Sequence, residues 1–406
     1  YSLLLDGLMA EREQGITIDV AYRYFTTDAR SFIVADTPGH EEYTRNMAVG
    51  ASYADLAVIL IDASLGLLPQ TKRHTRICAM MGIRHFVFVV NKMDLVNYDS
   101  SVFFDIENRI CKMTSPFGAG SLAVIPASAV NGDNVTFPSV NMPWYRGKAL
   151  LPYLEEIDIS PEETNYAFTL SVQRVCRPDR TFRGYQGEVS LGRIAVGNRV
   201  TVYPSGEKAG VSRILRGEKD VPSAEKGQSV TVCLDTAVDV SRGCVLSASD
   251  RLITDVIFTA QLLWMDDSPL RIGKSYLLKL ANQKLPAIVT AVKHKTDINT
   301  GEPCPEDTAE KNELVLCEIC ADKNVVFDLF TNNRDLGSLI LIDRLSHATC
   351  ACGVIRSHPK TARNLYSQKT DLTREVRAHR LGQTVLTIWF TGMSGRVNPP
   401  LPTLWS

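Results

Sequence analysis

The chain has 406 residues, of which 45% are hydrophobic and 22% charged, and its formal net charge at pH 7 is −1. This length suffices for about three globular domains, and the near-zero charge argues against a large nucleic-acid-binding surface. No run reaches the ~18 consecutive apolar residues of a membrane-spanning helix, and the N-terminus lacks a basic-then-apolar signal pattern. We therefore expect a cytoplasmic protein that meets neither a membrane nor a nucleic acid.

A candidate switch segment lies near the N-terminus. Residues 1–10 are typical of a helix already under way, and residues 11–19 (EREQGITID) lead into a strand expected from Ile18 to Phe25. Thr17 could place its hydroxyl on Mg²⁺ and its backbone N–H on a γ-phosphate. The alternative is a polar loop that merely enters the strand.

A second motif follows the apolar run at residues 32–35, in the turn Asp36-Thr37-Pro38-Gly39-His40. A carboxylate at the end of a buried strand, followed by a Gly whose N–H is open to close approach, suits a Mg²⁺–phosphate site. Turns of this kind also occur as ordinary loops. The interpretation therefore depends on companion motifs in register.

The companions come after the next strands. Asn91-Lys92-Met93-Asp94 follows an apolar run at 86–90, and Ala127-Ser128-Ala129 follows another at 122–126. Asp94 in the motif at residues 91–94 can accept hydrogen bonds from the N1–H and 2-amino groups of guanine, which adenine lacks. Backbone N–H groups of the segment at residues 127–129 could donate hydrogen bonds to the guanine O6. The combination indicates a guanine-nucleotide site.

Apolar strands alternate with helical segments as far as residue 156. We expect strands at 32–35, 56–62, 86–90 and 122–126, and helices at 43–52, 70–81, 101–113 and 148–156. This alternation predicts a mainly parallel sheet flanked by helices, with the ligand at the carboxyl ends of the strands.

After Pro161 the period changes to strict alternation divided by Gly-rich turns, which is typical of small closed β-barrels. We expect a nucleotide-binding domain over residues 1–160, a first barrel over 161–250 and a second over 251–356. Residues 357–382 have few large apolar side chains and are expected to be a linker. A new strand and Gly-rich turn begin within residues 383–406.

Taken together, these motifs resemble the translation-factor branch of P-loop GTPases, and in detail the GTPase subunit family of bacterial sulfate adenylyltransferase. The segments at 141–145 (NMPWY) and 182–187 (FRGYQG) extend the resemblance, which covers roughly residues 3–356. It implies an α/β GTPase domain followed by two β-barrels. The family's Gly-x-x-x-x-Gly-Lys-[Ser/Thr] loop is not found before Thr17, so we expect the natural protein to begin upstream, with its first strand and phosphate loop.

The resemblance also implies roles for individual residues. Thr17 and Asp36 would serve Mg²⁺, the Gly39 N–H would contact the γ-phosphate of GTP, and His40 would orient the attacking water. Asn91 and Asp94 would select guanine, and the stem of Lys92 would stack on the base. The remaining nucleotide-binding residues are expected to be Thr37, Pro38, Met93, Ser128 and Ala129. His40 could instead be an ordinary exposed loop histidine.

Two functions fit this domain layout. The first is the GTPase subunit of sulfate adenylyltransferase, in which GTP hydrolysis is coupled to formation of adenosine 5′-phosphosulfate and pyrophosphate from ATP and sulfate. The resemblance implies that AMP transfer takes place on a separate small ATP-binding subunit. The second is a translation factor that delivers aminoacyl-tRNA to the ribosome, for which the near-zero net charge is a poor match.

Two further patterns carry hypotheses of their own. Residues 384–395 resemble the opening of adenylylsulfate kinase, and a two-base change of reading frame after this point would restore its Gly-Lys-Ser loop. The pairs Cys317/Cys320 and Cys350/Cys352 could form a zinc site of the two-plus-two kind. Both pairs lie in alternating apolar stretches, which favours buried thiols without a ligand role.

Overall fold

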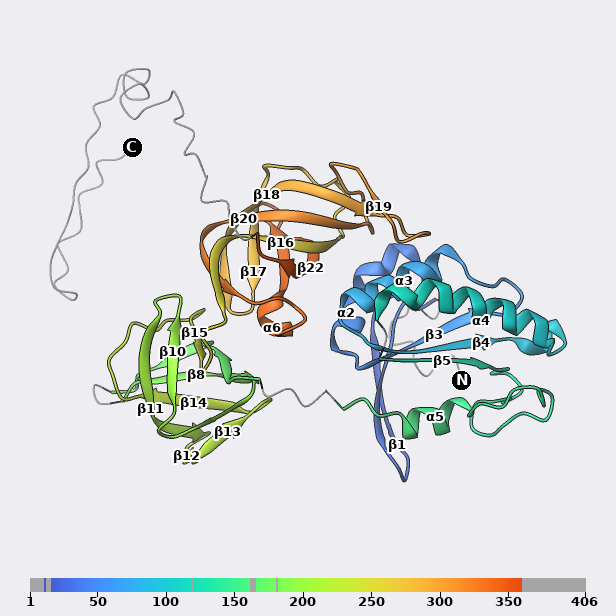
Figure 1. Ribbon diagram of the computed structural model, residues 1–406, viewed down its shortest axis with the longest axis horizontal. Coiled ribbons are helices and arrows are strands. Elements are labelled where there is room, and N and C mark those ends of the chain that lie inside the picture. Colours follow the sequence, from blue (N-terminus) through green and yellow to red (C-terminus); the bar gives the residue numbers. More distant parts are fainter. Residues whose placement is uncertain (1–10, 12–15, 119, 161–165, 180–181, 360–406) are drawn as a thin grey trace, which may run out of the picture. The chain divides into compact units, whose positions relative to one another are not determined.

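The structure is a computed structural model that describes residues 11, 16–118, 120–160, 166–179 and 182–359 (Figure 1). The expected helix in residues 1–10, most of the linker and the kinase-like residues 383–406 lie outside the described residues. No helix of the described chain is long and apolar enough to cross a membrane.

The first part of the described chain alternates strands and helices. Its elements are β1 (Ala21–Thr26), β2 (Ser31–Asp36), η2 (Glu41–Tyr43), α2 (Thr44–Tyr53), β3 (Leu56–Asp62), α3 (Pro69–Met80), β4 (His85–Asn91), η3 (Met93–Val96), α4 (Ser100–Thr114), η4 (Ser115–Phe117), β5 (Ser121–Pro126) and α5 (Leu150–Glu156). Among the described residues the expected elements all occur; their ends shift by at most two residues, except that β1 begins at Ala21 rather than at the expected Ile18.

The three strands β3, β4 and β5 form a parallel sheet in that order, with β4 in the centre. Phe86 and Phe88 of β4 pack into a core shared with α2, α3 and α4, whereas Val87 and Val89 pack toward α5. Figure 1 shows α5 on the face opposite α3 and α4. Because both faces of β4 are covered, its middle residues form a continuous apolar run rather than an alternating one.

The strand β2 departs from the expected sheet. It pairs antiparallel with β1, from Ala21 opposite Asp36 to Thr26 opposite Ser31, and within the described residues the parallel sheet contains only β3, β4 and β5. Ile33 on β2 is 68% exposed, and Leu60 on β3 is 64% exposed. The local pattern predicts a strand correctly, but its partner depends on what lies beside it.

The second part of the chain forms a closed six-stranded antiparallel barrel. Its ring runs β10 (Arg199–Tyr203), β15 (Val245–Ser247), β6 (Thr169–Ser171), β8 (Gly184–Leu191), β14 (Ser229–Leu234) and β11 (Glu207–Arg216), which pairs back with β10. The short strands β7 (Arg174–Cys176) and β12 (Lys219–Asp220) pair with β8 and β11, and β9 (Arg193–Ala195) and β13 (Ser223–Glu225) pair with each other in a separate two-stranded sheet. Alternate side chains fill the interior, which explains the period of two in the sequence.

A second closed barrel follows. Its ring runs β17 (Ser275–Leu280), β21 (Ser338–Asp343), β22 (Thr349–Ser357), β16 (Ile253–Trp264), β20 (Leu314–Phe327) and β18 (Gln283–Thr296), which pairs back with β17. A two-residue strand, β19 (Pro303–Cys304), and a short helix, α6 (Arg334–Gly337), complete it. The expected fold class, an α/β domain followed by two β-barrels, is confirmed.

Candidate functional site

The two motifs expected to bind the base follow neighbouring strands at the carboxyl edge of the parallel sheet. The register places Asp62 at the end of β3 beside Asn91 at the end of β4, and Val90 beside Pro126 at the end of β5. Since parallel strands end at one edge, the loops after β4 and β5 emerge next to each other. The two expected base-binding motifs occupy those loops.

Two side-chain contacts join the loops directly. Asn91 Oδ1 accepts a hydrogen bond from the Ala129 backbone N–H at 2.9 Å, and Ser128 Oγ donates to Asp94 Oδ1 at 2.6 Å. A carboxylate fixed in this way at the edge of a sheet is suited to accept from a planar ring that presents two adjacent N–H donors. The arrangement is therefore suited to a guanine base.

Lys92 makes an ion pair with a residue that the motifs did not include. Its Nζ lies 2.7 Å from Asp62 Oδ2, and Lys92 itself has a left-handed backbone with φ of 62°. The hydrogen bond from Lys92 is the main cause that lowers the pKa of Asp62 to about 2, helped by the Ser64 hydroxyl. Asp62 is therefore a carboxylate at neutral pH and restrains the head of Lys92 while leaving its stem half-exposed.

The expected phosphate turn follows β2. Thr37 packs so closely on α2 that a Cβ added at Gly50 would lie 2.5 Å from the Thr37 Cγ2, so only glycine fits there. A Cβ at Gly39 would meet nothing within 4 Å, which leaves the backbone of this turn open to a ligand. His40 is exposed, precedes η2 and makes no side-chain cap hydrogen bond.

The Thr17 segment is held against the same turn region from two sides. Glu11 Oε1 accepts from the backbone N–H groups of Ile18 at 2.9 Å and Asp19 at 3.1 Å. Asn46 on α2 donates through Nδ2 to the Ile18 carbonyl at 2.8 Å. Thr17 is half-buried, and α2 therefore contacts both the switch segment and, through Gly50, the phosphate turn.

The start of α2 is bonded to the second barrel. Asn312 Nδ2 donates to the Glu41 carbonyl at 2.9 Å. Arg45 Nη2 donates to the carbonyls of Met265 and Thr349, each at 3.2 Å. The carboxylate of Glu41 also pairs with Arg73 of α3 at 2.7 Å. The residues that follow the phosphate turn are thus hydrogen-bonded to the segment just after β16 and to the start of β22.

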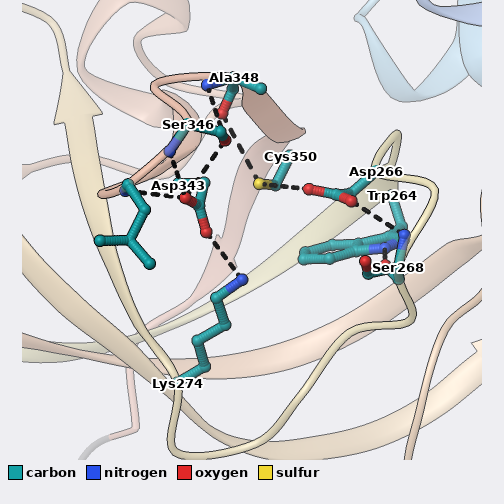
Figure 2. A network of polar contacts seen from close by, with 9 residues as sticks. Trp264, Asp266, Ser268, Lys274, Asp343, Ser346, Ala348 and Cys350 are labelled. Carbon is teal, nitrogen blue, oxygen red and sulfur yellow. Dashed lines mark hydrogen bonds and ion pairs between the residues drawn. The ribbon is translucent and has the colours of Figure 1, made fainter.

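The four cysteines considered for zinc do not form a metal site. Within the described part of the chain, no group of three or more His, Cys, Asp or Glu residues could hold a metal ion. Burial raises the pKa of Cys317, Cys350 and Cys352 to about 12, whereas zinc binds thiolates. Figure 2 shows Cys350 donating to Asp266 at 3.0 Å, beside the Lys274–Asp343 ion pair.

Sequence reasoning missed several residues that shape the site. The motifs after β4 and β5 lie in adjacent loops, whereas Asp36 ends β2, outside the parallel sheet. Residues not anticipated as parts of the site are Asp62, Asn46, Gly50, Tyr98 and Asp133. The NMPWY segment was the only sequence feature that pointed to two of these residues. Its Asn141 contacts the Asp133 carboxylate, and its Trp144 donates to the Tyr98 carbonyl. That segment could have drawn attention to the loops it touches.

Comparisons with known proteins agree with this geometry. Residues 2–205 match the family model for the elongation factor Tu GTP binding domain, and residues 257–356 match the model for a GTP-eEF1A C-terminal domain-like fold. The sulfate adenylyltransferase subunit 1 of Shewanella oneidensis is 46% identical over 374 residues, which cover 90% of this chain and 77% of the relative. The corresponding subunit of Laribacter hongkongensis is 44% identical and is 79% covered.

Longer relatives match as well. The bifunctional enzyme CysN/CysC of Xylella fastidiosa is 47% identical over 397 residues, which cover 97% of this chain and 64% of that protein. The chain thus spans less than two thirds of the length of this relative. A solved structure of Sup35 complexed with GDP matches with a TM-score of 0.45 and 24% identity, covering 82% of this chain and 83% of that one.

Proposed function

The chain belongs to the sulfate adenylyltransferase subunit 1 family, and its residues 2–205 match the elongation factor Tu GTP binding domain. From this premise we propose that it is a GTPase subunit of sulfate adenylyltransferase. GTP hydrolysis on this chain would be coupled to transfer of AMP from ATP to sulfate, which yields adenosine 5′-phosphosulfate and pyrophosphate. The observation that carries the proposal is the contact between Asp94 and Ser128, which fixes a carboxylate where a guanine edge would lie.

The base would be read by the two loops after β4 and β5. Asp94 would accept from the guanine N1–H and 2-amino groups, and Asn91 would hold the loops together through Ala129. Lys92, restrained by Asp62, would lay its stem along the base. Because adenine has no matching pair of donors, this arrangement selects GTP over ATP.

The phosphates of GTP would be bound by the turn after β2 and by the switch segment around Thr17. The Gly39 N–H would donate to the γ-phosphate, and His40 would orient the attacking water. Thr17 and Asp36 are the oxygen donors that this chain offers to Mg²⁺, which prefers carboxylates, hydroxyls and phosphates as ligands. When bound, Mg²⁺ would neutralise charge on the β- and γ-phosphates.

AMP transfer itself would take place on a small ATP-binding partner subunit, with ATP and sulfate as substrates of the complex. Sulfate is a weak nucleophile and the phosphosulfate anhydride is high in energy, which gives a reason to couple the step to GTP. All ten cysteines are free thiols, which is in keeping with a cytoplasmic location. We also propose that residues 383–406 begin an adenylylsulfate kinase-like domain, since the 47%-identical relative is named a bifunctional enzyme.

The decisive experiment mixes the full-length gene product with the candidate small subunit and follows sulfate-dependent release of pyrophosphate from ATP. GTP should raise this release and be consumed with it, whereas GDP should not raise it. If GTP is hydrolysed while ATP and sulfate are ignored, the sulfate-activation proposal fails. Binding of aminoacyl-tRNA would then be the next measurement.

A further inference from the structure

Tyr98 joins the two base-binding loops at a third point, in addition to the Asn91–Ala129 and Asp94–Ser128 contacts. Its Oη donates to Asp133 Oδ2 at 2.9 Å and accepts from Asn131 Nδ2 at 3.1 Å. Asp133 is in turn tied to Ser128 by two backbone hydrogen bonds of 3.0 and 3.2 Å. Asp94, Ser128, Asp133 and Tyr98 therefore form a closed ring of contacts, completed by the four-residue step from Asp94 to Tyr98.

The backbone of Tyr98 has an unusual conformation that directs this contact. Its φ is 56°, in the left-handed region that bulky side chains rarely adopt. The conformation is held by a hydrogen bond from the Tyr98 N–H to the Met93 carbonyl at 2.8 Å and by one from Trp144 Nε1 to the Tyr98 carbonyl at 3.1 Å. Such an outlier persists only where its surroundings fix it, and outliers of this kind cluster at ligand-binding sites.

Asp133 has other partners besides Tyr98. The Ser139 hydroxyl donates to Asp133 Oδ1 at 2.6 Å and is the main cause that keeps the pKa of Asp133 below its usual value. Asn141 Nδ2 lies 3.3 Å from the same oxygen. Removing the Tyr98 hydroxyl would therefore leave no uncompensated charge, so the domain should still fold.

We propose that Tyr98 and Asp133 are positioning residues that hold Asp94 in the orientation needed to read the guanine 2-amino group. The inference rests on the proposed GTP-binding function. The Asn91–Ala129 and Asp94–Ser128 bonds already join the two loops, and the Tyr98–Asp133 bond adds a third side-chain contact between them. This third contact further restricts the loop that carries Asp94, and a preorganised carboxylate discriminates between bases more sharply than a mobile one.

The test is the change of Tyr98 to Phe (Y98F) in the full-length gene product, with the dissociation constants of GDP and inosine diphosphate as the readout. Hypoxanthine is guanine without its 2-amino group, so the ratio of the two constants measures how well Asp94 is oriented. We expect the preference for GDP to fall about fivefold, which corresponds to one net hydrogen bond. Partial unfolding would weaken both ligands equally and leave the ratio unchanged.

Tyr145→Phe is the matched control. The Tyr145 hydroxyl lies within hydrogen-bond distance of the carbonyls of Lys148 at 3.2 Å and of Val124 in β5 at 3.4 Å. The variant therefore removes the same atom from the same domain without touching a hydrogen bond between the two loops. The Tyr145 variant should keep the wild-type ratio. If Tyr98→Phe also keeps it while the wild type prefers GDP, the positioning role is wrong and the proposed function stands. If the wild type shows no preference for GDP over inosine diphosphate, the guanine site itself fails, and this inference with it.

Asp133→Ala provides a second measurement. It should lower the GDP preference, and adding Tyr98→Phe on that background should have little further effect because the Tyr98–Asp133 hydrogen bond is already lost. Effects that multiply would show that the two residues act independently, which would overturn the inference. Should Asp133→Ala fail to fold, the Tyr98 and Tyr145 variants decide the question alone.

Discussion

Asp94 is the residue on which base selection depends. We expect Asp94→Asn to shift the preference from GTP toward xanthosine triphosphate, because an amide presents a donor where the carboxylate accepted. The Asn can still accept from Ser128 through its side-chain oxygen, so the loop contact would survive. Competition between the two nucleotides on the full-length gene product measures the shift. Unchanged selectivity for GTP would contradict the assignment.

His40 has an environment suited to a catalytic group rather than a structural one. It is exposed, and its side chain makes no cap hydrogen bond, so its loss should leave the fold intact. We expect His40→Ala to lower GTP hydrolysis by about two orders of magnitude, the usual contribution of a positioned proton-transfer group. Single-turnover hydrolysis and GTP affinity should be measured together, and an equal loss of both would point to a structural histidine.

At the scale of single residues, the motifs could be identified in the sequence, but the residues that contact and restrain them could not. The spacing of Asp36, Asn91 and Asp94 after apolar runs indicated their chemistry directly. Asp62 carries no such signal, because its partner Lys92 is thirty residues away (92 − 62 = 30) and the contact exists only when β3 and β4 pair. Gly50 was likewise hidden, since its importance comes from the methyl group of Thr37 across the turn.

At the scale of elements, α2 connects the phosphate turn to the second barrel. We expect Arg45→Ala to leave intrinsic GTP hydrolysis unchanged while weakening the GTP stimulation of pyrophosphate release, because its bonds to Met265 and Thr349 are lost. Arg30→Ala is the matched control, since Arg30 also donates to a backbone carbonyl, that of Leu154, within the GTPase domain. Equal effects of the two variants would contradict a specific role for Arg45.

The helix α3 contains a half-buried histidine, His74, whose protonation at low pH should destabilise the folded protein. Burial lowers the pKa of His74 to about 4, and Arg73 adds to the effect. Below the ordinary histidine pKa of 6.5 the unfolded chain binds a proton that the folded chain does not, so stability should fall as the pH drops from about 6.5 toward 4. Urea unfolding across this range should show a shallower decline for His74→Gln than for the wild type. Parallel curves would mean that His74 is protonated in the folded state.

The types of the elements were predictable, whereas one pairing was not. The helices at residues 70–81 and 101–113 and the strand at 56–62 follow from the local period of apolar residues, which depends only on neighbours in sequence. The position of β2 outside the parallel sheet depends on which strand lies beside it. The short apolar run at residues 32–35 of β2 does not specify a partner, and in the structure β2 pairs antiparallel with β1.

At the scale of the whole molecule, one apolar core joins the GTPase domain to the second barrel. Phe330 belongs to this core, and it lies so close to Gly82 that a Cβ there would be 2.8 Å from its ring. We expect Phe330→Ala to lower the free energy of unfolding by about 3 kcal/mol. Leu345→Ala is the control, because Leu345 is 92% exposed and should change it by less than ~0.5 kcal/mol.

Thermal unfolding followed by tryptophan fluorescence and by circular dichroism would check this expectation. If the domains share one core, both signals should shift together in the Phe330 variant. If the fluorescence and circular dichroism transitions no longer coincide, the barrel and the GTPase domain unfold separately. The order of the three folded parts could be predicted from the change of period near Pro161, but contacts such as Phe330 with Gly82 join residues far apart in sequence and left no local pattern.

The exposed apolar side chains on β2 and β3 affect how the protein behaves in concentrated solution. Ile33, Val58 and Leu60 are between 42% and 68% exposed on these strands, and exposed apolar strands are templates for pairing between chains. A polypeptide of these 406 residues should therefore scatter light increasingly as it is concentrated, and mild chaotropes should reverse this before either barrel unfolds. Colloidal stability would then be limited by two short strands rather than by the folding stability of the domains.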